Sequence, residues 1–135
     1  MRFGPSLSGG QATLRAVKGD EPLPPRLPQA DRVVIEERKV HGYLLSPTHP
    51  VGRLKARAFA ALGFDARTAD AFVEELRRIA ATGQVTSEED FEFGRKYTVV
   101  GELRGPAGAA HVLTVWVQEP GQAGVRLVTV RPRWP

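Results

Sequence analysis

The chain has 135 residues, no cysteine and a mild net charge of +4, with 19 Lys and Arg against 15 Asp and Glu. This length is typical of one domain that buries a core without staples, and the missing cysteines exclude disulfides, thiolate metal sites and a cysteine nucleophile. No apolar run approaches the roughly 18 residues of a membrane span. We therefore expect a cytoplasmic protein with no membrane attachment, no cofactor and no metal, because the three histidines lie far apart in the sequence. The absence of asparagine and the abundant proline are typical of a protein from a hot environment, and equally of a codon bias toward Gly, Ala, Arg and Pro.

Residues 1–26 contain "GPSLSGG" and "EPLPPRLP" and show no regular apolar spacing. This composition predicts an arm that is loosely attached or makes an intersubunit contact, with one short strand or helix at Gln11–Val17. Residues 27–135 then form a single domain.

Two helices are predicted in the first half of that domain. After a short extended stretch at Val33, the spacing of Val40, Tyr43 and Leu44 favours a helix that ends before Pro47. The second helix begins near Pro50, with Thr48 or His49 at its N-cap. Its buried stripe and its glycine stop are predicted to be Leu54, Ala58, Ala61, Leu62 and Gly63.

A third helix is predicted in "DARTADAFVEELRRIAATG", with Glu74 paired to Arg78 on its outer face and Gly83 at its end. Its inward residues are predicted to be Phe72, Val73, Leu76, Ile79 and Ala80. After Gly83 the period changes to two, and four strands separated by short turns indicate an antiparallel meander. The predicted fold class is α+β: N-terminal helices followed by a four-stranded antiparallel β-meander, with the helices packed on one sheet face.

Both faces of this sheet contain apolar residues, but the one that carries Thr114, Trp116, Thr129 and Arg131 is predicted to be the more polar. Such a face can present an aromatic platform and a cation to a ligand. The alternative is that Trp116 packs beneath a helix or the arm. The acidic run "SEEDFE" is predicted to be a solvated strand edge.

His49 has the most informative setting of the three histidines. It stands between two prolines in "SPTHPVGRLK", just before a helix whose first turn offers free N–H groups to an anion. An imidazole titrates near neutrality and can move protons, and Arg53 falls on the same side of the helix. The alternative is that His49 only caps the helix.

The stretches "LLSPTHPVGRLKA", "YTVVGEL" and "VLTVWVQEPGQAGVRLVTVRP" resemble a small bacterial domain family of unknown function, which occurs free-standing and at the C-terminus of secreted adhesin or toxin-like chains. The resemblance covers roughly residues 27–132. The order of helices and strands is similar to the ribonuclease group of barnase, EndoU, colicin-type tRNases and RelE. This likeness implies a metal-independent RNase-like activity, while the fold alone does not fix a function.

The resemblance implies a site drawn from both halves of the chain. Its implied catalytic residues are His49, Lys55, Tyr97, Thr114 and Thr129, and its binding residues are Arg53 and Trp116. Arg131, on the more polar sheet face, is a further expected binding residue. RNA or another anionic ligand is the expected partner, and a homodimer that binds a protein or an anion without catalysis is the alternative. The enzyme requires His49, a cation and one of the sheet hydroxyls to reach one phosphate, and the sequence places no second acid-base group opposite His49.

Overall fold

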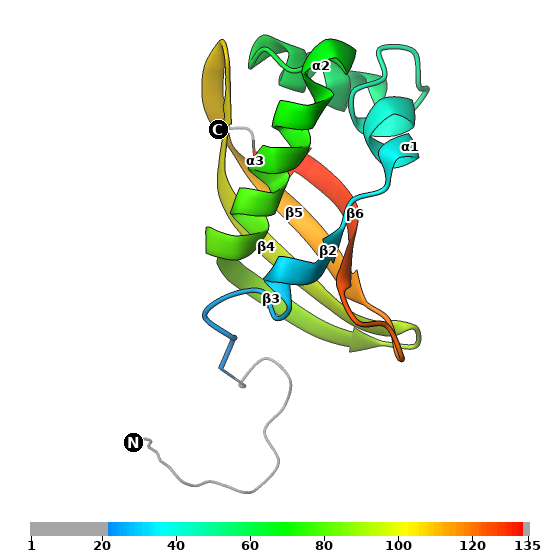
Figure 1. The fold of residues 1–135 in the computed structure, drawn as a ribbon, viewed down its shortest axis with the longest axis vertical. Helices are drawn as coiled ribbons and strands as arrows, with labels where there is room; N and C mark the ends of the chain where they lie inside the picture. The colour runs from blue at the N-terminus through cyan, green and yellow to red at the C-terminus, as the bar shows by residue number, and fades with distance from the viewer. Residues whose placement is uncertain (1–21, 134–135) are drawn as a thin grey trace, which may run out of the picture.

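The computed structural model describes residues 22–133, so most of the predicted arm, including Gln11–Val17, lies outside the described part. A parallel strand precedes the α-helices, and four further strands follow them (Figure 1). Among the short helical elements, η2 and η4 are 3-10 helices and η3 is a π-helix. The elements in chain order are η2 (Ala30–Arg32), β2 (Val33–Val34), α1 (Glu37–Lys39), η3 (Val40–Leu44), α2 (Arg53–Ala61), η4 (Ala66–Thr68), α3 (Ala69–Thr82), β3 (Gln84–Phe91), β4 (Gly94–Gly105), β5 (Gly108–Gln118) and β6 (Val125–Pro132).

The sheet is mixed and has five strands in the order β2-β6-β5-β4-β3. The α+β class and the antiparallel meander of β3 to β6 are confirmed, but the predicted four-stranded, wholly antiparallel sheet is wrong. Strand β2 adds a parallel edge, pairing Val33 with Val125 and Val34 with Arg126. Strand β2 has only two residues, which are too few to show an alternating pattern. Its partner strand lies near the other end of the chain, so no local sequence pattern predicts this pairing. At the opposite edge β3 carries the acidic run, with Glu89 and Asp90 exposed.

Helix α3 covers one face of the sheet and supplies much of the core (Figure 1). Phe72, Leu76 and Ile79 are fully buried, as the helical spacing predicts, and Gly83 forms the C-cap. The predicted Glu74–Arg78 pair does not form. Instead the ion pairs join Glu74 to Arg77 and Glu75 to Arg78, three residues apart.

Helix α2 lies near one end of the sheet, and its buried face differs from the predicted stripe (Figure 1). Ala56 and Phe59 are its buried residues, whereas Leu54 is 63% exposed and Ala61 is exposed. Burying the Phe59 ring against Phe72, at 5.1 Å between ring centroids, removes more apolar surface than burying alanines would. The predicted stop at Gly63 is confirmed by its left-handed backbone, with φ of 96°.

The predicted polar sheet face is not an open face. Thr114 and Trp116 are fully buried on the helix side, where the Thr114 hydroxyl donates to the Val99 carbonyl at 2.7 Å and accepts from Trp116 Nε1 at 2.8 Å. An irregularity in β6 places Leu127 opposite Trp116 and Thr129 opposite Val115. Because of this shift, Thr129 does not share a sheet face with Thr114 and Trp116, although simple alternation predicts that it does. Trp116 packs in the core, as the alternative prediction held.

Candidate functional site

Helical elements η3 and α2 lie in a segment without carboxylates. Residues 38–64, called here the acid-free segment, contain five Lys or Arg, two His and no Asp or Glu. Residues 120–133, which include β6, also contain no acid. The structure brings these two parts of the chain together where α2 packs on β6. A surface built from both of them has few internal partners for its cations.

Two local features position Tyr43 within the acid-free segment. The π-helix η3 widens the turn, with the Leu45 N–H donating to the Val40 carbonyl at 2.8 Å. Gly52 then packs directly on Tyr43, because an added Cβ would collide with the Tyr43 carbonyl oxygen and lie 2.9 Å from a ring carbon. The start of α2 therefore lies against η3 only because residue 52 has no side chain.

Lys55 joins η3, α2 and β6 through its ammonium group. Its Nζ donates to Tyr43 Oη at 2.8 Å and to Thr129 Oγ1 at 2.7 Å, and it lies 4.9 Å from the Tyr43 ring centroid. All three side chains are half-buried. Both acceptors are hydroxyl oxygens, and no carboxylate within residues 22–133 forms an ion pair with Lys55.

Tyr43 is the titratable group that this arrangement perturbs. The hydrogen bond and charge of Lys55 lower the pKa of Tyr43 below the usual 10.0, against an opposing effect of burial, with smaller contributions from Thr129 and Lys39. Lys39 donates from Nζ to the Val128 carbonyl at 2.8 Å on the same strand. The phenolate form of Tyr43 is thus stabilised by cations from two helical elements.

His49 caps the turn that leads into α2. Its Nδ1 accepts from the backbone N–H of Val51 at 3.0 Å and of Gly52 at 2.9 Å, and its own N–H donates to Ser46 Oγ at 3.2 Å. An accepting Nδ1 places the proton of the neutral ring on Nε2. The ring also meets Tyr43 edge-on, with 5.0 Å between centroids. Helix α2 itself begins at Arg53, with Gly52 as its N-cap and no side-chain cap bond, so the predicted N-cap at Thr48 or His49 is wrong. His49 instead caps the turn before the helix, and its ring borders Tyr43.

The structure brings together only some of the predicted site residues. His49, Lys55 and Thr129 converge on Tyr43, which we call the tyrosine cluster. Arg53 stands at the start of α2 with its guanidinium donating to the Pro50 carbonyl at 2.8 Å, and Arg131 is exposed near the end of β6. The core holds the other three predicted residues: Tyr97, Thr114 and Trp116.

Sequence reasoning does not identify two members of the site, Tyr43 and Lys39. Tyr43 was assigned to the buried face of its helix, and its ring does pack beside the core. The missing signal is the composition of the acid-free segment, because a long stretch with several cations and no carboxylate predicts few internal ion pairs. Any group with a perturbed pKa in such a stretch is a candidate for function.

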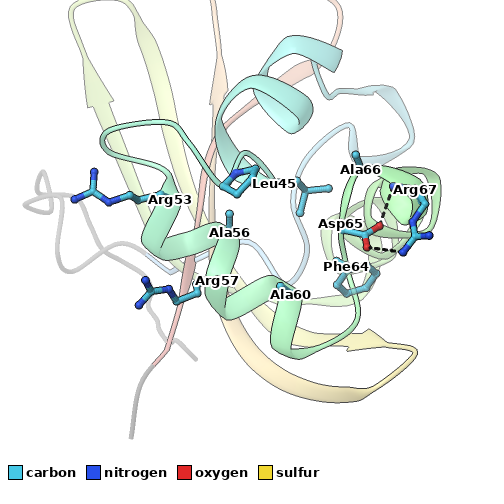
Figure 2. A pocket seen from close by; sticks show the side chains of 10 residues that line it. Leu45, Arg53, Ala56, Arg57, Ala60, Phe64, Asp65, Ala66 and Arg67 are labelled. Carbon is cyan, nitrogen blue, oxygen red and sulfur yellow. Dashed lines mark hydrogen bonds and ion pairs between the residues drawn. The ribbon is translucent and has the colours of Figure 1, made fainter.

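A separate hollow of about 610 Å³ lies on another side of α2. Figure 2 shows Arg53, Arg57 and Ala60 along α2, with Phe64 and the Asp65–Arg67 pair across the hollow. Asp65 is the only carboxylate in this lining; it caps η4 and lies 3.6 Å from Arg67. Within residues 22–133, no group of three or more potential ligands is placed to hold a metal ion, and no helix is long and apolar enough to cross a membrane.

Comparison with known proteins gives a family and a fold. Residues 26–133 match the family model described as "Domain of unknown function (DUF6883)". No curated protein matches the chain at a significant level. Among solved structures, the chain is similar to one from a contact-dependent growth inhibition toxin–immunity protein complex of Klebsiella pneumoniae 342, with a TM-score of 0.60 and 16% identity over 74% of this chain and 99% of that chain. At this identity the likeness shows a shared fold.

Proposed function

The chain belongs to the family described as Domain of unknown function (DUF6883), and we propose that it is a toxin-related ribonuclease that cleaves RNA without a metal. The observation that carries the proposal is the Lys55 ammonium, bonded to both Tyr43 and Thr129 where two acid-free stretches of the chain meet. The similar chain comes from a toxin–immunity complex, which supports the toxin-related part of the proposal.

RNA cleavage through the 2′-hydroxyl needs a base, an acid and a counter-charge for the phosphorane. We assign the base to the Tyr43 phenolate, whose pKa is lowered chiefly by Lys55. It accepts the 2′-hydroxyl proton while the 2′-oxygen attacks phosphorus. The bond from phosphorus to the 5′-oxygen then breaks, leaving a 2′,3′-cyclic phosphate.

Lys55 is assigned two roles in the same step. Its ammonium opposes the charge that develops on the phosphorane and then gives a proton to the departing 5′-oxygen. The Tyr43 hydroxyl returns its new proton to Lys55 along their 2.8 Å hydrogen bond, so the pair is restored without an outside group. Thr129 holds Nζ in place through the 2.7 Å bond. Tyr43 thus fills the role for which the sequence offered no second group.

His49 is better suited to donate than to shuttle protons. Protonation at Nδ1 would break its bonds from the Val51 and Gly52 amides, so we assign it a neutral ring with Nε2–H directed to a phosphate oxygen. Its second role is to hold the turn that positions Lys55. His49→Asn separates these roles, because asparagine keeps a capping oxygen. We expect His49→Asn to fold normally but cleave more slowly, whereas full activity would leave His49 as a cap alone.

The proposal is tested by incubating the full chain with total tRNA and a small panel of labelled RNAs in EDTA. We expect cleavage that falls about 100-fold or more in Tyr43→Phe and in Lys55→Met, the range typical of a lost acid-base or charge-stabilising group. Tyr97→Phe and Lys96→Met are matched controls outside the tyrosine cluster, and thermal melting checks the fold of each variant. An inactive parent protein, or full activity in Tyr43→Phe, would contradict the proposal.

A further inference from the structure

A second apolar groove, of about 910 Å³, runs between α2 and the ends of two strands. Helix α2 contributes Leu54 and Ala58, and its C-cap is Leu62. Ala110 and Val112 from β5 and Pro132 from β6 form the opposite side. Neither Tyr43 nor Lys55 lines this groove, so it is separate from the tyrosine cluster.

The α2 side of the groove is the apolar stripe that sequence periodicity assigned to the core. Leu54 instead remains 63% exposed, while Ala56 is buried on another side of the helix and Phe59, at the floor of the groove, is buried in the core. Helix α2 therefore has two apolar faces, and within the described residues only one of them is covered. An exposed apolar patch beside a polar rim is typical of an interaction surface.

The rim of the groove is cationic. Arg57, His111 and Arg133 line it and are exposed, and none of their side chains has an ion pair or hydrogen bond within the described residues. A backbone bond of 3.0 Å from the Arg133 amide to the His111 carbonyl keeps the last two side by side. Every stretch that lines the groove lacks acids, because residues 103–118 contain no Asp or Glu either. Within residues 22–133, the groove therefore offers apolar contact but no counter-charge for its three cationic side chains.

We propose that this groove docks a short acidic amphipathic helix of a protein partner. The apolar side chains of that helix fill the groove, and its carboxylates bind Arg57, His111 and Arg133. A strand is a poorer occupant, because the adjacent backbone is already paired, Ala110 with Leu103 and Val112 with Pro132. A helix satisfies its own backbone and needs only apolar contact and charge.

The length of α2 sets the size of the occupant. Its nine residues rise about 13 Å, which corresponds to between two and three turns of a partner helix. Apolar positions three and four residues apart on the partner would then lie over Ala58 and Leu54, with acidic residues flanking them. This binding site does not depend on the proposed ribonuclease activity.

The test uses a designed, fluorescently labelled helical peptide of that length, with leucines on one face and glutamates beside them. Its twin carries lysines in place of the glutamates. Fluorescence anisotropy should show saturable binding of the acidic peptide, at least about tenfold tighter than its twin. Ala58→Glu, which fills and charges the groove, and Arg57→Glu should each weaken binding by about tenfold or more. Ala81→Glu and Arg77→Glu, at exposed positions of α3, should leave it unchanged.

Several results would overturn the proposal: no saturation, equal binding of both peptides, or unchanged binding to Ala58→Glu. Sedimentation that showed a dimer of this chain lost in Ala58→Glu would assign the groove to a second copy instead. Lys55→Met should bind the acidic peptide like the parent protein. A failure of the ribonuclease proposal therefore leaves this test intact, and the reverse also holds.

Discussion

The cations of the two halves of the molecule have different partners. Around α3, β3 and β4 they bind carboxylates: Arg78 bonds Glu75, Arg95 bonds Glu88 and Asp90, and Lys96 lies 3.4 Å from Glu89. In the acid-free segment, Lys39, Arg53 and Lys55 bond hydroxyl or carbonyl oxygens in place of carboxylates: those of Tyr43, Thr129, Val128 and Pro50. An incoming phosphate therefore competes with no ion-paired carboxylate of residues 22–133 for these three cations. The ion-paired half stabilises the fold, and the other half remains available to an external anion.

The largest effect is expected from breaking the contact that assembles the acid-free half. Gly52→Ala places a methyl group against the Tyr43 backbone and should push α2 away from η3. Overpacking of this kind costs about 1–3 kcal/mol of stability, and a displacement of about 1 Å at a site can cost about 100-fold in rate. Denaturant unfolding and RNA cleavage measure the two effects. Gly42→Ala is the control, since nothing lies within 4 Å of its added Cβ. Equal stability and equal cleavage rates in the two variants would mean that the contact between Gly52 and Tyr43 does not position α2.

A smaller effect, confined to stability, is expected in the ion-paired half. The Glu75 carboxylate accepts from Arg78 and from the Arg104 amide, both at 2.8 Å, and so ties α3 to β4. Glu75→Gln should cost about 1–2 kcal/mol, in the range of a lost charge-assisted bond, without slowing cleavage. The exposed Glu74→Gln should change stability by less than about 1 kcal/mol. A loss of cleavage in Glu75→Gln, with the fold intact, would contradict the view that the ion-paired half only stabilises the fold.

The same carboxylate predicts a pH dependence. Arg78 and the Arg104 amide hold the pKa of Glu75 below its usual value of about 4.5. A depressed pKa gives stability that is complete above the unfolded value and is lost as pH falls below it. The stability difference between the parent protein and Glu75→Gln should therefore shrink below about pH 4.5. A constant difference down to low pH would show that the ionised form is not what stabilises α3.

RNA affinity should depend on an arginine of the acid-free segment but not on an arginine of the ion-paired half. Arg53→Glu should weaken RNA binding several-fold at low salt, and raising the salt should reduce the difference, because the contact is to phosphate. Arg77→Glu should have little effect, since Arg77 already lies 3.7 Å from Glu74. Fluorescence anisotropy with a labelled RNA measures both. Equal losses in the two variants would indicate binding through net charge alone.

The smallest effect is a spectroscopic one. The chain has two tyrosines, and their pKa values move in opposite directions: Lys55 lowers that of Tyr43, and burial raises that of Tyr97. Ultraviolet titration of tyrosinate should therefore show two steps, one below and one above the usual 10.0. The lower step should disappear in Tyr43→Phe and shift upward in Lys55→Met. A single step at the ordinary value would show that Lys55 does not stabilise the phenolate.

Much of the fold could be predicted from local pattern. Period-two alternation identified β3 to β6, and the spacing of Phe72, Leu76 and Ile79 identified the buried face of α3. The buried face of α2 could not be predicted, because apolar residues lie on both of its sides and packing of Phe59 selected one. Alternation also divides a strand into two faces without showing which face is covered. The sequence therefore allowed Trp116 to be either a buried core residue or part of an open binding face.

Less of the site was predictable, because its parts are distant in the sequence. His49 and Lys55 were found from the turn and the helix start, but the bond from Lys55 to Thr129 spans 74 residues. Tyr43 acquires its chemistry only when η3, α2 and β6 pack together. Pattern reasoning therefore assigned it to the core, and the lack of acids around it was the one available signal.

The most direct test of the central claim is cleavage of a short labelled RNA by the full chain in EDTA, beside the same RNA with one 2′-deoxy residue at the cleaved position. The mechanism through Tyr43 and Lys55 predicts a 2′,3′-cyclic phosphate end on the first RNA, no cleavage at the substituted position of the second, and a loss of about 100-fold in Tyr43→Phe. Cleavage of the 2′-deoxy substrate at the same position, or a rate independent of Tyr43, would contradict the account.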